Sequence, residues 1–330
     1  MMPVNLAVIG YGRIGKIHST NALSSENTNL KIIIDPLIDE TTSSDYLGLK
    51  KSKKMSSLLE IDDIDGVIIC SPSDYHIEHI QEASKKTKNI FCEKPLGLSV
   101  DEIMRIKRLI KEKNLNLHVG FNRRFDPDFY NLKQLVSKGE IGKTHTIKIT
   151  SRDPSPPPIS YVKKSGGLFL DMTIHDFDMA KYLADSEISS LYAKGGCFIN
   201  PEIKEAGDID TAIINMTLKN GVLVTINNSR QAVYGYDQRI EVLGSRGTLK
   251  VENRLLHGVQ KGTKEGFTSA NPQDFFIDRY KEAYEQEILN FISSIRGQDV
   301  DYANVDDGLH SLKAGLAAKL SLQKNLLVNL

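Results

Sequence analysis

The run GYGRIG at residues 10–15 constrains the fold of this chain more than any other feature. It overlaps the end of the apolar run NLAVIG, which is typical of a β-strand, and it ends where a helical pattern begins. Its glycines have the G-x-G-x-x-G spacing of a strand, a tight turn and a helix that meet at a diphosphate. The pattern therefore predicts a dinucleotide site at a helix N-terminus. The expected contacts of this loop are Gly10, Gly12, Arg13, Ile14 and Gly15.

An acidic residue, Asp35, ends the second apolar run, LKIIID, about 20 residues after the last glycine. Its carboxylate can accept hydrogen bonds from a ribose 2′-hydroxyl and would repel a 2′-phosphate. The following residues, Pro36 and Leu37, supply no compensating arginine. An ordinary turn-forming aspartate before proline is the alternative, and the glycine spacing makes it the weaker one. We therefore predict NAD rather than NADP as the cofactor.

Strand-like runs alternate with helical patterns over the first third of the chain. The expected strands are residues 5–10, 30–35, 66–71, 89–95 and 117–121. Helical patterns are clearest at residues 76–85 and 99–113, and Ser99 with Glu102 forms a capping-box sequence. This alternation predicts an α/β fold: an N-terminal, NAD-binding Rossmann domain with a doubly wound parallel sheet over residues 1–121. Ligands of such sheets bind at the carboxyl ends of the strands.

After residue 121, strand-like runs follow one another with few helices between them. They are residues 144–150, 191–198, 212–218, 222–228, 239–243 and 248–251. The sequence Lys219-Asn220-Gly221 joins two of them and predicts a hairpin. We expect residues 122–330 to form an α+β domain for substrate binding and oligomerisation, with a mainly antiparallel open sheet. Its helices are expected at residues 169–183 and near the C-terminus, and its free sheet face suits subunit association.

Composition excludes several function classes. The 330 residues include 42 basic and 42 acidic side chains, so no nucleic-acid partner is indicated. The lysine-rich run at residues 49–54 is interpreted as a solvated loop or helix face. No signal-peptide pattern precedes the first strand, and no apolar run approaches the length of a membrane helix. The three cysteines lack metal or redox spacing, which indicates buried thiols and a cytoplasmic location.

Polar residues follow two of the expected parallel strands. Ser71 and Pro72 end the third run, and the Pro72 ring could line a cofactor pocket; His76 begins the next helix. On its own, His76 is better explained as structural, and we include it among the cofactor contacts with Ser71 and Pro72. Glu93 and Lys94 end the fourth run and should face the same crevice, so we also count them among the cofactor contacts. A lysine beside a nicotinamide ring could donate or relay a proton.

The run GGLFLDMTIHD at residues 166–176 supplies an acid and a histidine. With Asp178, the residues Asp171 and His175 are spaced to share one face of a helix. A solvated polar face, a divalent metal site or substrate chemistry could explain them. The absence of a His-Glu-x-x-His pattern and a nearby Lys94 argue against metal, and the apolar start of the helix argues against a solvated face. We therefore predict substrate chemistry and no metal.

Four motifs in order, GYGRIG, SPSDYH, FCEKP and SGGLFLDMTIHDFD, resemble those of the Gfo/Idh/MocA oxidoreductases over essentially the whole chain. The segments at residues 151–161 and 227–239 are similar to those of the family's myo-inositol 2-dehydrogenases. The resemblance implies a catalytic Lys–Asp–His set and a cis peptide bond before Pro95. It also implies a cytoplasmic homotetramer that serves inositol catabolism. The implied catalytic residues are Lys94, Asp171 and His175, and the implied substrate-lining residues are Arg124, Asp153 and Tyr236 in addition to these three.

The implied activity is oxidation of myo-inositol to 2-keto-myo-inositol by hydride transfer to NAD. In this scheme His175 removes the hydroxyl proton, Lys94 holds that oxygen, and Asp171 orients Lys94 or the substrate. Two alternatives stay open: a dehydrogenase of scyllo-inositol or a pyranose, and an NAD-dependent glycosidase. A cofactor-binding sensor without turnover is disfavoured, because a sensor has no need of a proton acceptor.

Overall fold

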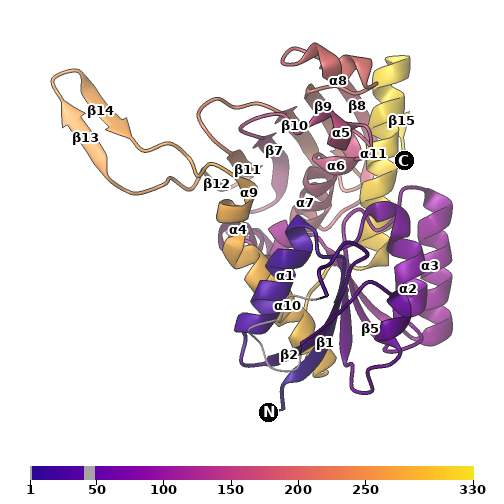
Figure 1. The fold of residues 1–330 in the computed structure, drawn as a ribbon. Helices are drawn as coiled ribbons and strands as arrows, with labels where there is room; N and C mark the ends of the chain where they lie inside the picture. The colour runs from indigo at the N-terminus through magenta and orange to yellow at the C-terminus, as the bar shows by residue number, and fades with distance from the viewer. Residues whose placement is uncertain (1, 41–48) are drawn as a thin grey trace. The chain divides into compact units, whose positions relative to one another are not determined.

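The computed structural model describes residues 2–40 and 49–330, which form two compact units (Figure 1). The first unit comprises Met1–Phe125 with Ala283–Leu312, and the second comprises Asp126–Glu282 with Lys313–Leu330. The expected boundary at residue 121 lies close to the first junction, whereas the return of 283–312 to the first unit has no local sequence signal. The division of functions between residues 1–121 and 122–330 stays a prediction.

The first unit contains a six-stranded parallel sheet in the order β3-β2-β1-β4-β5-β6, which confirms the predicted Rossmann fold. Its strands are β1 Val4–Ile9, β2 Thr28–Ile34, β3 Lys50–Ser52, β4 Gly66–Ile69, β5 Asn89–Glu93 and β6 Asn116–Gly120. Its helices are α1 Arg13–Ser24, α2 His76–Ala83, α3 Val100–Lys113 and α10 Lys281–Ile295, with 3-10 turns η1 Met55–Leu58, η2 Ser73–Tyr75 and η3 Asn122–Phe125. The capping box of Ser99 and Glu102 is present at the start of α3.

Strand β3 was not predicted, because its sequence is lysine-rich. Lys50–Ser52 pairs in parallel with Ile32–Ile34 of β2 at the edge of the sheet. The Lys50 side chain lies at the surface in an ion pair of 2.8 Å with Glu60. Charged side chains are common on edge strands, since one side of such a strand faces water. The interpretation of residues 49–54 as a solvated loop or helix face is therefore wrong for Lys50–Ser52, whose backbone belongs to the sheet.

Helix α10 joins the first unit through apolar packing. Ile288, Phe291 and Ile292 lie in one buried cluster with residues of β1, including Leu6. A side chain at Gly66, at the start of β4, would place its Cβ 2.7 Å from Ile295 of this helix. A larger residue at position 66 would therefore have to displace side chains of the helix and of β1. This packing explains why a segment so late in the chain belongs to the first unit.

The second unit is built on a seven-stranded sheet in the order β12-β11-β7-β10-β9-β8-β15. Neighbouring strands are antiparallel except β7 and β10, which confirms the mainly antiparallel prediction. The predicted hairpin joins β9 to β10, with Gly221 at φ +87°. The strands are β7 Thr144–Arg152, β8 Ile188–Gly196, β9 Thr211–Leu218, β10 Leu223–Ser229, β11 Asp237–Gly244, β12 Gly247–Val251 and β15 Val328–Asn329.

One face of this sheet is buried and the other is left uncovered by the chain's described residues. On β10, Val224 and Ile226 are buried while Leu223 and Thr225 are exposed. A separate ribbon, β13 Gln260–Thr263 with β14 Gly266–Ser269, has only exposed residues and extends away from the large sheet of its unit (Figure 1). The remaining helices of this unit are α4 Pro127–Ser137, α5 Ile159–Val162, α6 Leu168–Asp171, α7 Ile174–Ala184, α8 Pro201–Glu205 and α9 Phe276–Arg279, and α11 Val305–Lys324 ends in it.

The predicted helix over residues 169–183 is two helices, α6 and α7, so that expectation is wrong. The backbone N–H of Thr173 donates to the carbonyl of Leu168, five residues back, at 3.0 Å. The Thr173 hydroxyl also donates to the Asn228 side chain of β10 at 2.6 Å. The widened local turn and the tertiary contact with Asn228 accompany the break between α6 and α7.

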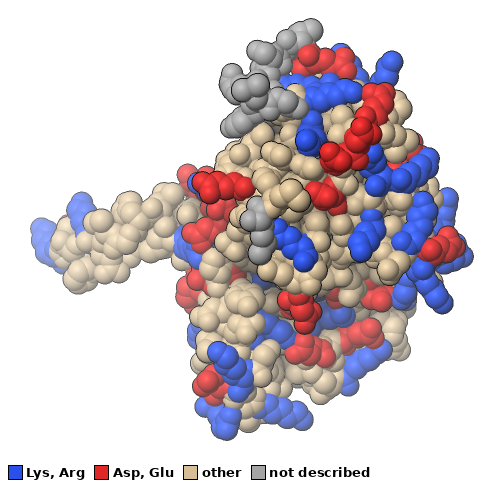
Figure 2. All heavy atoms as spheres, turned by 90° about the horizontal axis from the view of Figure 1, so that it is seen from below, with Lys and Arg blue, Asp and Glu red and all other residues tan. Residues whose placement is uncertain are grey.

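Within the described part of the chain, no helix is both long and apolar enough to cross a membrane. On the face shown in Figure 2, basic and acidic side chains are interspersed, in keeping with a formal net charge of zero. Such a surface offers no broad field of one sign to attract a polyanion.

Candidate active site

The three glycines of the loop after β1 have distinct structural roles. Gly10 has φ +90°, and a Cβ there would lie 2.5 Å from the Ser71 backbone nitrogen. A Cβ on Gly15 would lie 2.0 Å from the Gly10 carbonyl oxygen, so the helix could not pack on the strand end. Gly12 caps α1 without a side-chain hydrogen bond, and a Cβ there would meet nothing within 4 Å. The loop therefore leaves open space at the helix N-terminus, which fits a diphosphate.

The Asp35 side chain lies beside this loop at the end of β2. Its carboxylate accepts a hydrogen bond from the Tyr11 backbone N–H at 2.7 Å and another from the Leu37 N–H at 2.8 Å. The side chain is half-buried, so part of the carboxylate stays accessible. This placement fits the predicted contact with a ribose hydroxyl.

Replacing Asp35 by serine should change the cofactor preference. Loss of the carboxylate removes a charged acceptor for the 2′-hydroxyl and the repulsion of a 2′-phosphate, so the ratio of kcat/KM for NAD over NADP should fall about 10-fold to 100-fold. Steady-state kinetics with both cofactors measure this ratio, and Asp63→Ser, at an exposed acid of the same unit, serves as the control. An unchanged ratio in Asp35→Ser would remove Asp35 from the ribose site.

His76 supports the loops that follow β4 and β5. The side chain is 1% exposed. Its Nδ1 lies 2.9 Å from the Pro95 carbonyl oxygen and its Nε2 lies 2.9 Å from the Ser71 carbonyl oxygen. Burial lowers the pKa of His76, and the two carbonyls partly oppose that effect. Both ring nitrogens lie beside carbonyl oxygens, so His76 fixes the loop of Ser71 and Pro72, and its expected contact with a cofactor stays a prediction.

Glu93 and Lys94 lie at the carboxyl end of β5, as expected from the strand pattern. Glu93 is buried and accepts a hydrogen bond from His18 Nε2 at 2.8 Å. The Lys94 backbone N–H donates to the Glu93 carboxylate at 3.3 Å, and the Lys94 side chain is half-buried. The Lys94–Pro95 peptide bond is cis, which confirms what the family resemblance implied.

Arg124, expected to line the substrate pocket, lies in turn η3 of the first unit. Its guanidinium is buried and lies 3.2 Å from the Asp307 carboxylate, which is also buried. The ion pair connects η3 to the first turn of α11. A substrate-lining role for Arg124 stays a prediction.

In the second unit, the Asp171 carboxylate is held by two side chains. Tyr161 Oη donates to it at 2.8 Å, and Arg230 Nη1 donates to it at 3.3 Å. Arg230 is 1% exposed and also lies 3.6 Å from the Asp208 carboxylate. Asp208 in turn accepts hydrogen bonds from the Leu168 N–H at the start of α6. The Arg230 cation thus balances two carboxylates, one of which is the expected catalytic acid.

Neither Arg230 nor Asp208 was singled out by sequence reasoning. Arg230 lies within the run at residues 227–239 that carried the family resemblance, directly after the end of β10. An arginine directly after an apolar strand was the available signal, and it did not indicate which carboxylate the arginine would meet.

His175 is positioned by the first turn of α7, which polar contacts fix to the sheet. Asp176 is fully buried and accepts hydrogen bonds from Ser151 at 2.6 Å and from Asn228 at 2.7 Å. His175 itself is half-buried, whereas Asp178 is 1% exposed. The predicted common face is interrupted between Asp171, at the end of α6, and His175, in the first turn of α7, whereas His175 and Asp178 keep their helical spacing within α7.

Asp153 and Tyr236 are the two remaining residues that were expected to bind substrate. Asp153 directly follows β7, and Tyr236 directly precedes β11, which pairs with β7. The Asp153 N–H donates to the Ser229 carbonyl at 2.9 Å, and the Asp153 side chain is half-buried. Tyr236 is 6% exposed, and its ring meets the edge of Tyr280 at a centroid distance of 6.0 Å. Both residues belong to the second unit with Asp171 and His175, while Lys94 belongs to the first. A shared role in one reaction stays a prediction.

Comparisons with known proteins identify the family of this chain. The family profile described as "Oxidoreductase family, NAD-binding Rossmann fold" matches residues 4–121, and the "GFO/IDH/MocA C-terminal domain" matches residues 129–250. An uncharacterized oxidoreductase of Bacillus subtilis is 44% identical over 96% of this chain and 93% of its own length. A myo-inositol 2-dehydrogenase of Thermotoga maritima is 41% identical over 99% of this chain and 98% of its own length.

A solved structure extends the likeness to the fold. The scyllo-inositol dehydrogenase of Lactobacillus casei, with bound NAD(H) and scyllo-inositol, is 32% identical, with a TM-score of 0.90 and 99% of each chain covered. The family profiles together match well over half of the chain, and the first of them covers all six strands of the parallel sheet. This chain therefore belongs to the Gfo/Idh/MocA oxidoreductases, and its parallel sheet is the NAD-binding Rossmann fold of that family.

Proposed function

We propose that this enzyme is an NAD-dependent inositol 2-dehydrogenase that oxidises myo-inositol to 2-keto-myo-inositol. One observation carries the proposal: Tyr161 and Arg230 donate hydrogen bonds to the Asp171 carboxylate. Asp171 ends α6, the helix that comes just before His175 in the chain. A fixed carboxylate close in sequence to a half-buried imidazole suits the handling of a hydroxyl proton. The printed substrates of the T. maritima and L. casei relatives, myo-inositol and scyllo-inositol, support a cyclitol.

The proposed roles of the chain's own residues follow from their chemistry. His175 accepts the proton of the reacting hydroxyl, and Lys94 holds the same oxygen and relays the proton. Asp171 orients Lys94 or a substrate hydroxyl. Arg124, Asp153 and Tyr236 supply further donors and acceptors for the ring of hydroxyls. NAD, when bound on the glycine loop, supplies the hydride acceptor.

Two alternatives are tested with the main proposal. The L. casei relative carries scyllo-inositol, which supports scyllo-inositol as a second candidate substrate, and a pyranose presents a similar ring of hydroxyls. An NAD-dependent glycosidase of the same fold would bind the same cofactor but would yield no net NADH from a free polyol.

The first test is NADH formation by the purified enzyme with NAD and, in separate assays, myo-inositol, scyllo-inositol, glucose and an aryl glycoside. We expect the highest kcat/KM with myo-inositol, and at least about tenfold lower kcat/KM when NADP replaces NAD. Faster turnover of scyllo-inositol or glucose would contradict the substrate assignment. Release of the aryl group without NADH formation from any polyol would show a glycosidase.

We also propose that the enzyme is a homotetramer that works in the cytoplasm. The uncovered sheet face, with Leu223 54% exposed, and the exposed β13–β14 ribbon, with Phe267 82% exposed, support association of copies. An isolated two-stranded ribbon is marginally stable in water, so a covering subunit would stabilise it. Three free thiols, at Cys70, Cys92 and Cys197, support a reducing compartment.

A further inference from the structure

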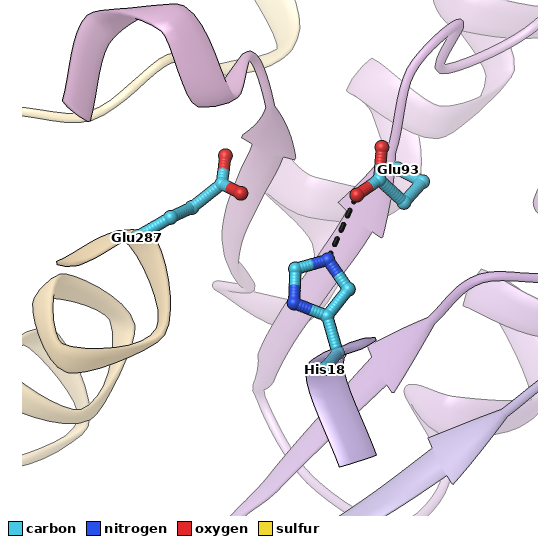
Figure 3. Close-up of side chains that lie close together, drawn as sticks. All are labelled: His18, Glu93 and Glu287. Carbon is cyan, nitrogen blue, oxygen red and sulfur yellow. Dashed lines mark hydrogen bonds and ion pairs between the residues drawn. The ribbon is translucent and has the colours of Figure 1, made fainter. Parts of the chain in front are cut away.

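A buried group of three titratable side chains lies behind the strand end that carries Lys94. His18 of α1, Glu93 of β5 and Glu287 of α10 point toward one another (Figure 3). All three belong to the first unit, and their exposed fractions are 0%, 8% and 1%. Candidate ligand atoms of the three side chains lie within 4.8 Å of one another. Two carboxylates this close in a buried region cannot both stay charged without a balancing proton or cation.

The contacts within the group favour a proton over a metal ion. His18 Nε2 and Glu93 Oε1 are 2.8 Å apart, a hydrogen bond (Figure 3). Two ligands of one metal would point their lone pairs at the ion and would not share a hydrogen between them. The His18 ring also packs edge-on against the rings of Phe91 and Tyr284, with ring centroids 5.2 Å and 5.6 Å away, respectively.

Glu287 is the side chain that needs the proton. Neither of its carboxylate oxygens has a hydrogen-bond partner among the described residues. Burial raises the pKa of Glu287 well above its ordinary value, and the negative charge of Glu93 adds to the effect. The other titratable groups nearby are Tyr284 and the thiols of Cys70 and Cys92, and burial raises both thiol pKa values well above the ordinary value. Both thiols therefore stay neutral across the physiological pH range.

We propose that Glu287 is a neutral carboxylic acid in the folded enzyme, and that Glu287 and His18 are positioning residues that fix the orientation of Glu93. Glu93 is the residue before Lys94, and its carboxylate accepts the Lys94 backbone N–H at 3.3 Å. A charged Glu287 would repel Glu93 and displace it from both of its hydrogen bonds. The effect on catalysis rests on the proposed role of Lys94, whereas the protonation of Glu287 does not.

The protonation is tested by melting curves of the wild type and Glu287→Gln from pH 5 to pH 8. An unfolded glutamate ionises near pH 4.3, so above that pH the wild type must lose a proton on unfolding. Its stability relative to Glu287→Gln should fall with rising pH, by up to about tenfold in the folding constant per pH unit. The Tm of Glu287→Gln minus that of the wild type should therefore increase steadily with pH. Glu285→Gln removes one carboxylate from the same helix at a less buried position, and it is the control for the loss of a carboxylate in general.

The positioning role is tested by kinetics of Glu287→Ala and Glu287→Gln. We expect Glu287→Ala to lower kcat about tenfold or more with a smaller change in KM, because Glu93 loses its neighbour and shifts. Glu287→Gln should recover most of the lost kcat, since it is neutral and has the same shape. Equal loss of kcat in both variants, or no loss in either, would overturn the positioning role.

Two outcomes would overturn the protonation itself. One is a Tm difference between Glu287→Gln and the wild type that stays constant from pH 5 to pH 8. The other is a stoichiometric divalent metal in the purified wild type that Glu287→Gln lacks, measured by elemental analysis. Because melting needs no substrate, failure of the enzyme to oxidise any polyol would remove the proposed function and leave the melting result intact.

Discussion

Alanine at Lys94 or at His175 is expected to lower kcat about 10²-fold to 10⁴-fold, which is the usual contribution of a positioned acid or base. The reason is that alkoxide character must develop on the substrate oxygen before a hydride can leave its carbon. His175 accepts the proton, and Lys94 stabilises the oxygen that loses it. Neither side chain belongs to the glycine loop, so the affinity for NAD should change little.

The measurements are steady-state kinetics with the preferred polyol and calorimetric titration of each variant with NAD. Lys88→Ala and His257→Ala, at exposed positions of the first and second units respectively, are the matched controls and should behave as the wild type. Turnover close to the wild-type value in both Lys94→Ala and His175→Ala would exclude the proton-handling assignment. A large loss in only one of them would show that the other residue acts outside the reaction.

The second large effect is expected from Arg230→Met. Arg230 is 1% exposed and is the cation that lies 3.3 Å from Asp171 and 3.6 Å from Asp208. Its removal would take the positive charge away from beside two largely buried carboxylates. Breaking a buried ion pair in this way costs about 3–5 kcal/mol. For a unit of this size, that loss lowers Tm by about 6–20 °C.

Melting curves of three variants separate charge from geometry. Arg230→Lys keeps the positive charge without the planar fork and should lie between the wild type and Arg230→Met. Lys219→Met removes one partner of an exposed ion pair with Glu187 in the same unit, and its melting curve should match that of the wild type. If Arg230→Met has the same Tm as the wild type, the stability of the fold does not depend on this cation beside the two carboxylates. We also expect Arg230→Met to lower kcat, since Asp171 loses a side chain that hydrogen-bonds to its carboxylate.

The local sequence predicted most of the strands because burial in a sheet leaves a short-range pattern. Runs such as residues 30–35 are apolar since both faces of a parallel sheet are covered, and the hairpin at Gly221 is set by three adjacent residues. The prediction failed at residues 169–183, where the apolar pattern continues through the break. The Thr173 and Asp176 contacts with Asn228 accompany that break, and Asn228 lies on another element.

Some residues of the candidate site could likewise be predicted from the sequence, and others could not. The glycine loop and Asp35 could be predicted because their function needs fixed local spacing. A structural role for His76 was also available from the sequence, but the two carbonyl oxygens beside its ring nitrogens could not be predicted, because they belong to separate loops. Arg230 was missed for a related reason: it meets Asp171 and Asp208 only once β10 and α6 have packed together.

By itself the sequence determined the family, the parallel and antiparallel sheets, the cofactor loop and the residue types available for proton chemistry. Each of these depends on spacing within one segment or on the order of segments along the chain. Only the tertiary structure decided which charges are buried together. It placed Arg230 between two carboxylates and joined His18, Glu93 and Glu287, which come from three distant parts of the chain. The energy of a buried charge depends on all of its neighbours in space, and that information is not contained in any local run of residues.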